Sequence, residues 1–262
     1  MSEHIRLETN AQGVATVTLT RAEKHNAFDD IVIADLTTVF TELDRDTNVR
    51  VVVLAAEGKS FSAGADLGWM QRMARYTEAE NHADAMALAT MLHSLYSLSK
   101  PTIAAVNGAA FGGAVGLVSC CDMAIASDRA SFCLSEVKLG LIPATISPYV
   151  IQAIGTRMAR RYFLSAERFD AHQAKHMNLV HEVVTPNELN NAVSALTQQL
   201  LNNSPAALTA SKTLIDTVAT QPISAQLRED TSRRIAAIRV SEQGQEGLTA
   251  FLQKRAPNWV KH

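Results

Sequence analysis

One carboxylate in this sequence stands where general acid–base chemistry would be favoured. Glu136 lies in the apolar segment 132–143, FCLSEVKLGLIP. Burying a charged carboxyl group among apolar neighbours is unfavourable, so we expect the pKa of Glu136 to rise. A carboxyl group with a raised pKa can exchange protons near neutral pH. The alternative is an exposed glutamate paired with Lys138 or Arg129, because most glutamates are exposed.

Two loops of small residues could bind an oxyanion. They are 60–67, SFSAGADL, and 107–116, NGAAFGGAVG, and each lies between a strand-like and a helical pattern. Small residues let a ligand approach the main chain, and N–H groups at a helix start have no intrahelical acceptor. The alternatives are a turn with Asp66 as a helix cap, and glycines that allow close helix–strand packing. A dinucleotide-binding loop is disfavoured because the glycines do not match G-x-G-x-x-G.

Alternating strand and helix patterns must position these loops. Two continuous apolar runs are typical of strands buried on both faces, and Thr77 with Glu80 forms a capping box that begins a helix. The alternation predicts an α/β core with a parallel sheet. After Pro143 the pattern is mostly helical, with a strand-like run at 179–184 and a helix expected to begin at Pro186. The other expected elements are a hairpin at 5–19, helices at 29–43, 77–98 and up to 121, and strands at 51–55, 102–106 and 123–126.

The composition narrows the class of protein. The 262 residues are 47% hydrophobic and 19% charged, which suits a globular chain with a large core. A net charge of −2 gives no general attraction to nucleic acid or to a membrane surface. Cys120, Cys121 and Cys133 are expected to be buried thiols and no secretory signal is visible, so we expect a cytoplasmic protein. His172 and His176 have the spacing of a zinc pair but lack the accompanying glutamate, so we expect no metal site.

Taken together, the motifs resemble those of the crotonase, or enoyl-CoA hydratase/isomerase, superfamily. Their order is Ala-Gly-Ala-Asp at 63–66, Asn-Gly-x-x-x-Gly-Gly at 107–113, and Glu136 followed by Leu-Gly-x-x-Pro at 139–143. The similarity covers nearly the whole chain, from RAEKHNA near the N-terminus to FLQKR in the tail.

The resemblance implies a fold and an assembly. Residues 1–190 would form a spiral of repeated ββα units, and residues 191–262 a C-terminal helical region that trimerises. Homotrimers, or homohexamers built from two trimers, would follow. The substrate would be an acyl-CoA thioester, and no cofactor would be needed beyond the CoA of that substrate.

The resemblance also assigns roles to individual residues. The thioester oxygen would lie between the backbone N–H groups of Ala65 and Gly113, and Glu136 would exchange a proton with a substrate carbon. Donors fixed where enolate charge develops would contribute about 3–4 kcal/mol each. Lys24 and Lys254 would meet the CoA phosphates as point charges. The other expected substrate and CoA contacts are Ala27, Ala63, Asp66, Leu67, Gly112, Gly116, Arg72 and Arg75.

The sequence departs from the family at one catalytic position. Hydratases of this family have another glutamate twenty residues before the one that matches Glu136, and this chain has Gly116 there. Either Glu136 carries out both proton transfers, or another group helps to hold the water. Thr145, Ser147 and Tyr149 are the hydroxyl candidates.

Among subfamilies, the segments 60–70, 111–117 and 120–124 are most similar to bacterial methylglutaconyl-CoA hydratases of leucine breakdown. The implied reaction is hydration of 3-methylglutaconyl-CoA to 3-hydroxy-3-methylglutaryl-CoA. Arg72 and Arg75 either bind the second carboxylate of that substrate or are solvated. Isohexenylglutaconyl-CoA is an alternative substrate, and Δ3,Δ2-enoyl-CoA isomerisation is an alternative reaction that a single glutamate favours. A non-catalytic CoA- or RNA-binding protein is a further alternative, which the net charge disfavours for RNA.

Overall fold

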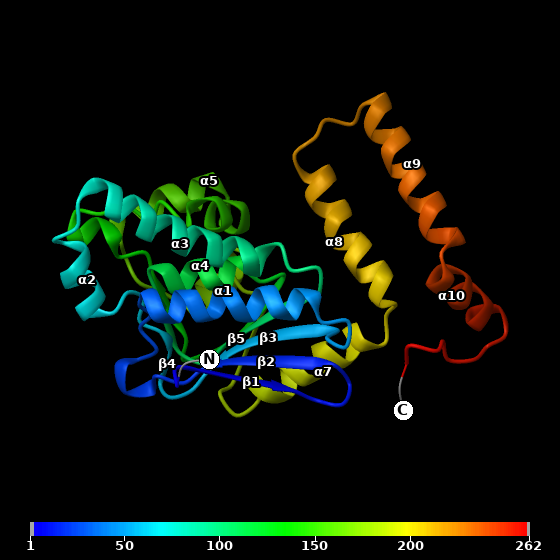
Figure 1. The fold of residues 1–262 in the computed structure, drawn as a ribbon, viewed down its shortest axis with the longest axis horizontal. Helices are drawn as coiled ribbons and strands as arrows, with labels where there is room; N and C mark the ends of the chain where they lie inside the picture. Colours follow the sequence, from blue (N-terminus) through cyan, green and yellow to red (C-terminus); the bar gives the residue numbers. More distant parts are fainter. Residues whose placement is uncertain (1–2, 261–262) are drawn as a thin grey trace.

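The computed structural model describes residues 3–260, and its body is built on two sheets (Figure 1). In the larger sheet, the first two strands are antiparallel and all later neighbours are parallel. The expected α/β core with a parallel sheet is therefore confirmed. In spatial order the larger sheet contains β1 (Ile5–Thr9), β2 (Val14–Leu19), β3 (Val51–Ala56), β5 (Thr102–Val106), β7 (Met123–Ser127) and β10 (Glu182–Val184). The smaller sheet contains β4 (Ser60–Ser62), β6 (Ala109–Phe111), β8 (Ser131–Cys133) and β9 (Phe169–Asp170).

The chain follows a repeated ββα path. Strands β3, β5 and β7 each continue into a short strand of the smaller sheet, and each short strand leads to a helix. This arrangement confirms the spiral that the resemblance implies. Because β4, β6 and β8 are parallel neighbours, their carboxyl ends meet at one edge, where loops commonly bind ligands. The helical elements that follow are α2 (Leu67–Met73) and α3 (Glu78–Tyr96), then α4 (Gly113–Cys120), then the 3-10 helix η2 (Glu136–Leu139) and α5 (Ser147–Ser165).

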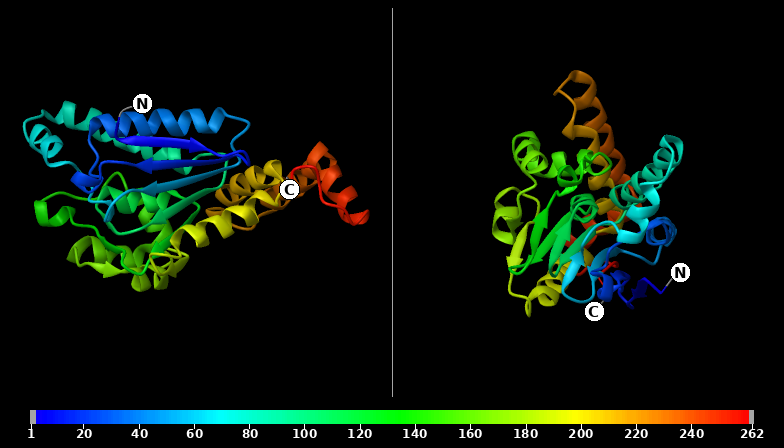
Figure 2. Two further views of the ribbon diagram at one scale, coloured as in Figure 1. Left: turned by 90° about the horizontal axis from the view of Figure 1, so that it is seen from below. Right: turned by 90° about the vertical axis from the view of Figure 1, so that its left-hand side faces the viewer.

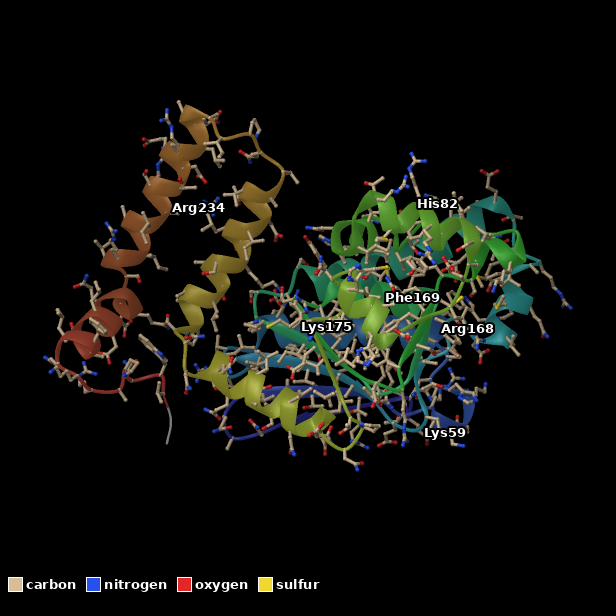
Figure 3. The ribbon with its side chains drawn as sticks, turned by 180° about the vertical axis from the view of Figure 1, so that it is seen from behind. Lys59, His82, Arg168, Phe169, Lys175 and Arg234 are labelled. Atoms are coloured by element: carbon tan, nitrogen blue, oxygen red, sulfur yellow. The ribbon has the colours of Figure 1, made fainter. Side chains whose placement is uncertain are left out.

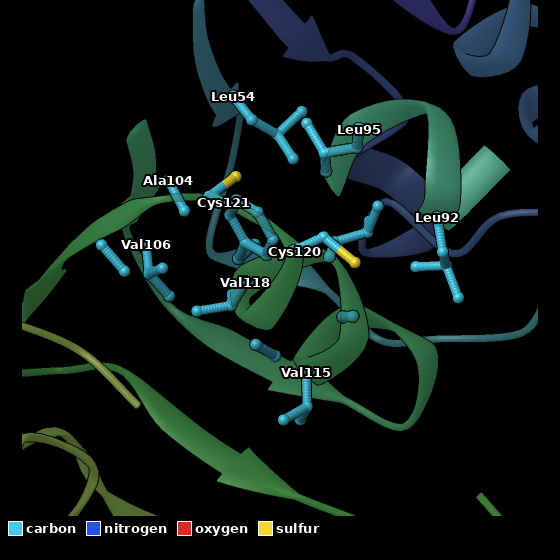
Figure 4. Packing of buried hydrophobic residues seen from close by; sticks show 14 of the residues in the cluster. Leu54, Leu92, Leu95, Ala104, Val106, Val115, Val118, Cys120 and Cys121 are labelled. Carbon is cyan, nitrogen blue, oxygen red and sulfur yellow. The ribbon is translucent and has the colours of Figure 1, made fainter. Parts of the chain in front are cut away.

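Helices cover both faces of the larger sheet (Figures 1 and 2). On one face, Leu54 packs in a core with α1 (Asp30–Arg45), α3 and α4, and on the other Val53 packs against α7 (Leu189–Leu201). Successive side chains of a strand point to opposite faces, so one apolar run supplies both cores. Figure 4 shows part of the first core, with Leu54, Ala104 and Val106 of the sheet near Leu92, Leu95, Val115, Val118, Cys120 and Cys121.

The C-terminal helices form an arm that projects from the body (Figures 1 and 2). It contains α8 (Pro205–Ala219), α9 (Ala225–Val240) and α10 (Glu242–Leu252). Figure 3 shows Arg234 on this arm, well separated from Phe169 in the body. The expected C-terminal helical region is present, but α7 packs against the sheet, so the projecting part begins with α8 rather than at residue 191. Arg50 of the body holds both ends of the arm by donating hydrogen bonds to the carbonyl oxygens of Asn203 (3.1 Å), before α8, and Trp259 (2.9 Å), after α10.

Most expected elements are confirmed, and the differences have local causes. The Thr77–Glu80 capping box is formed at the start of α3, and the three cysteines are buried thiols. The helix expected at Pro186 begins instead at Leu189. The Glu188 carboxylate accepts hydrogen bonds from the N–H (3.3 Å) and hydroxyl (2.7 Å) of Thr185, which closes a turn before the helix. No helix within residues 3–260 is long and apolar enough to cross a bilayer. The remaining helical elements are η1 (Ala22–Lys24) and α6 (Ala171–His176).

Candidate active site

The loop after β4 presents the N–H of Ala65 away from its neighbouring chain segment. Phe28 forms an isolated parallel bridge with Ala65, in which its N–H donates to Gly64 O (2.9 Å) and its C=O accepts from Asp66 N (3.0 Å). A residue bridged in this way directs its own N–H and C=O to the opposite side. The N–H of Ala63 donates to His25 O (2.9 Å) and that of Gly64 to Ser62 Oγ (3.2 Å), whereas the N–H of Ala65 is directed away from Phe28 and can meet a ligand.

The same loop packs against the start of α4. A Cβ atom placed on Gly64, which has φ +90°, would lie 2.8 Å from Phe111 O and 4.0 Å from the Cα of Gly112. Only glycine fits there, so the loop before Ala65 lies close against the segment that leads into Gly113, the first residue of α4. The N–H of that residue has no intrahelical acceptor. The two donors that the sequence analysis assigned to the thioester oxygen are therefore brought together.

Phe28 positions both donors, which the sequence analysis missed. Its main chain fixes the loop around Ala65, and its ring lies against Gly113, where a Cβ atom would be 2.5 Å from Cζ. Phe28 is 2% exposed, and its ring lies 6.3 Å from that of Trp69. Phe28 directly follows the segment RAEKHNA (21–27), and this place in the sequence gave no sign that it would contact both donors.

Glu136 faces the same helix end. Its Oε1 lies 3.3 Å from where a Cβ of Gly112 would stand, and Gly112 is the N-cap of α4. Burial raises the pKa of Glu136, as the sequence analysis expected, and a hydrogen bond from its own backbone opposes that shift only in part. Its Oε2 is buried and has no hydrogen-bond partner among the described residues. A carboxylate in this state can take up a proton from a ligand.

Asp66 supports the loop from inside the protein. Its Oδ1 caps α2 by accepting hydrogen bonds from the N–H groups of Gly68 (2.8 Å) and Trp69 (3.2 Å). Its Oδ2 lies 3.6 Å from the buried guanidinium of Arg21 and 3.3 Å from Nζ of Lys24. Burial raises the pKa of Asp66, but the hydrogen bonds outweigh burial and the net shift is downward. The Asp66 side chain thus forms the helix cap that was the alternative interpretation of this loop.

The other predicted contacts are distributed around this loop. Leu67 is 75% exposed and Ala63 is exposed beside it, whereas Ala27 is buried. Arg72 forms an ion pair with Asp30 on the surface, and Arg75 is exposed. Lys254 follows α10, at the opposite end of the molecule from α2, so it does not line this site within one chain (Figure 1).

The side chain of Ile146 packs over Gly116, and the sequence analysis did not identify this contact. A Cβ atom on Gly116 would lie 2.3 Å from Cγ2 and 2.8 Å from Cβ of Ile146. Of the hydroxyl candidates, Ser147 donates to Ala144 O (2.7 Å) and Tyr149 packs against Tyr96, with ring centroids 5.1 Å apart. The space beside Glu136 is therefore apolar at this position.

Comparisons with known proteins agree with this geometry. The model of the enoyl-CoA hydratase/isomerase family matches residues 9–262. This chain belongs to that family. An enoyl-CoA hydratase from Shewanella pealeana has a solved structure with 48% identity and a TM-score of 0.95, covering 98% of this chain and 96% of its own. An enoyl-CoA hydratase/isomerase from Marinobacter aquaeolei has 31% identity and a TM-score of 0.94, covering 99% and 100%. Carnitinyl-CoA dehydratase from Salmonella arizonae is 32% identical over the full length of both chains.

As a member of this family the chain is an enzyme, and the placement of the Ala65 and Gly113 N–H groups can be tested through Phe28. We expect Phe28→Leu to lower kcat by about 10–100-fold with little change in KM, because misplacing a donor by about 1 Å can cost 10²-fold. Phe40→Leu, at a fully buried position of α1, is the matched control and should keep kcat. Steady-state kinetics of both variants measure the effect. Equal losses in the two variants would show that Phe28 acts only through general stability.

The raised pKa of Glu136 predicts the pH dependence of the enzyme. The carboxylate form must be present at the start if Glu136 first accepts a proton, so kcat/KM should fall as pH drops through its pKa. Because burial raises that pKa, the acid limb should lie above the ordinary value of 4.5. A pH profile of kcat/KM measures the position of this acid limb. The residual activity of Glu136→Gln is the control, and its profile should lack the acid limb. A limb on the basic side instead would mean that the protonated form starts the reaction.

Proposed function

We propose that this enzyme adds water to a branched 2-enoyl-CoA, 3-methylglutaconyl-CoA, and gives 3-hydroxy-3-methylglutaryl-CoA in leucine breakdown. The observation that carries the hydratase proposal is the half-buried carboxylate of Glu136, whose Oε2 has no hydrogen-bond partner among the described residues, beside the end of α4 that carries the N–H of Gly113. Relatives named enoyl-CoA hydratase and carnitinyl-CoA dehydratase support addition or removal of water. The choice of acyl chain rests on the similarity of the sequence segments described above.

The reaction follows from the arrangement of these groups. The thioester oxygen accepts hydrogen bonds from the N–H groups of Ala65 and Gly113, which makes C3 electrophilic. Water bonds to C3 as the Glu136 carboxylate takes its proton, and the C2–C3 π electrons move to form an enolate. Protonated Glu136 then gives that proton to C2. A single carboxylate thus carries out both proton transfers, and the enzyme returns to its starting state.

The second carboxylate of the proposed substrate needs a cationic partner. Arg75 is exposed on the turn after α2, and Arg72 is held by Asp30. Arg75 is therefore the better of the two candidates. Isohexenylglutaconyl-CoA carries the same second carboxylate on a longer chain and is the alternative substrate.

Isomerisation of a 3-enoyl-CoA is the second candidate reaction. The observation that favours it is Ile146, which fills the space over Gly116 and leaves Glu136 without a neighbouring carboxylate there. Moving one proton between C2 and C4 needs only one base.

Steady-state turnover of purified enzyme with four thioesters tests these alternatives. We expect a clear preference for 3-methylglutaconyl-CoA over crotonyl-CoA, with isohexenylglutaconyl-CoA and a 3-enoyl-CoA as comparisons. Turnover with a chelator and no added cofactor should be undiminished. Conversion of only the 3-enoyl-CoA would replace hydration by isomerisation. Binding of CoA thioesters or salt-dependent retention of RNA, without turnover of any thioester, would favour the non-catalytic alternative.

Self-association through the projecting arm belongs to the same proposal. The arm exposes large apolar side chains, as expected of a surface that meets another subunit. Light scattering should give the mass of a homotrimer or a homohexamer, and a monomer at micromolar concentration would contradict it. The exposed apolar residues are Ile215, Ile223, Ile235, Val240, Leu248, Phe251 and Leu252.

A further inference from the structure

The side chains of Glu136 and Ile146 both pack against glycines at the N-terminal end of α4. The Glu136 carboxylate lies over Gly112, and Ile146 lies over Gly116. Gly112 is the N-cap of α4 and Gly116 lies four residues further along, so the two glycines are about 6 Å apart along the helix axis. Ile146 therefore stands about one turn further along α4 than the carboxylate, on the side away from the Gly113 N–H.

The position of the reacting carbons follows from the same geometry. With the thioester oxygen at the N–H of Gly113, Glu136 must reach C2 and the water at C3 within hydrogen-bonding distance. A substituent on C3 then extends past the carboxylate in the direction of α4, where Ile146 lies. Ile146 is 1% exposed and stiff at χ1, and Leu92 packs behind the same glycine, 3.4 Å from where its Cβ would be.

We propose that Ile146 is a specificity-determining residue, whose side chain forms an apolar wall for the substituent on C3 of the acyl chain. The proposal rests on the proposed hydration, because the position of C3 is inferred from the geometry that this reaction requires. It goes further than the proposed hydration in stating that Ile146 makes the enzyme prefer thioesters branched at C3 over unbranched ones. One methyl group in a fitted apolar pocket is worth about 10–200-fold in kcat/KM.

A pair of substrates that differ by one methyl group tests the wall. We expect Ile146→Ala to lower the ratio of kcat/KM for 3-methylcrotonyl-CoA over crotonyl-CoA by about tenfold relative to the unmodified enzyme. Comparing the two ratios cancels the different intrinsic reactivity of the two thioesters. Ile146→Val removes one methylene group and should give a smaller change in the same direction. A ratio within twofold of the original in both variants would overturn the proposal.

Controls separate this test from folding and from the proposed reaction. Leu43→Ala makes a comparable core cavity in α1, away from Gly116, and should leave the ratio unchanged. Binding of the saturated pair isovaleryl-CoA and butyryl-CoA, measured by calorimetry, needs no turnover. If the enzyme hydrates neither of these thioesters nor 3-methylglutaconyl-CoA, the proposed function fails. A preference for isovaleryl-CoA that Ile146→Ala abolishes would still support the wall, and equal binding of the pair by the unmodified enzyme would exclude it.

Discussion

Replacing Glu136 with glutamine should lower kcat by about 10²–10⁴-fold, because the amide cannot accept and return the proton. Glutamine has nearly the same shape, so the loop around Gly112 and the binding of saturated acyl-CoA should be retained. Steady-state kinetics and calorimetry measure the two quantities. Glu167→Gln, at a surface carboxylate paired with Arg161, is the matched control and should keep full activity. A fall in kcat of less than about tenfold, which corresponds to roughly 1.4 kcal/mol, would remove Glu136 from the centre of the reaction.

The same variant should be more stable than the unmodified enzyme at neutral pH. Burial raises the pKa of Glu136 in the folded state, so folded protein holds the proton more tightly than unfolded protein does. Stability is therefore lost as pH rises through the raised pKa, and glutamine does not carry that loss. Tm of Glu136→Gln should exceed that of the unmodified enzyme at pH 7, and the difference should narrow toward pH 4.5. A lower Tm at pH 7 would show that the carboxylate stabilises the fold.

The long elements could be predicted from sequence because their signals are local. The continuous apolar run of β3 and the Thr77–Glu80 capping box each reflect contacts within a few residues. Strands β4, β6 and β8 have only three residues each, too few for a period-two pattern. They become strands because parallel neighbours distant in the sequence pair with them. Only the family resemblance, through its ββα spiral, indicated them.

In the candidate site, too, features with a local sequence signal could be predicted and features that depend on long-range contacts could not. Glu136 could be singled out because its apolar neighbours are adjacent in sequence, and the glycines because their type limits what can pack on them. Phe28 and Ile146 could not, because an apolar residue gives no sign of which distant glycine it will cover. Asp66 could be recognised as a helix cap from the sequence, and its hydrogen bonds to the N–H groups of Gly68 and Trp69 confirm that cap.

Introducing a glutamate at Gly116 should destabilise the enzyme severely, although this change would restore the glutamate that hydratases of the family have at this position. A Cβ at this position would overlap Ile146 at 2.3 Å, and the carboxylate would be buried. Overpacking costs about 1–3 kcal/mol and an unpartnered buried polar group about 1–3 kcal/mol more. We expect Tm to fall by about 5–15 °C, or folded protein to be lost. Calorimetry measures the effect, and a Tm equal to that of the unmodified enzyme would contradict the packing described here.

The double variant Gly116→Glu with Ile146→Gly separates packing from charge. Removing the isoleucine side chain deletes the two atoms closer than 3 Å to the new Cβ and leaves Leu92 Cδ2 at 3.4 Å, so part of the lost stability should return relative to Gly116→Glu alone. The new carboxylate would then stand about one turn of α4 from Glu136 and, as a like charge, should raise the pKa of Glu136 further. The acid limb of kcat/KM should accordingly move to higher pH. Recovered stability without that movement would mean that the new carboxylate points away from Glu136, and that Ile146 alone keeps the space apolar.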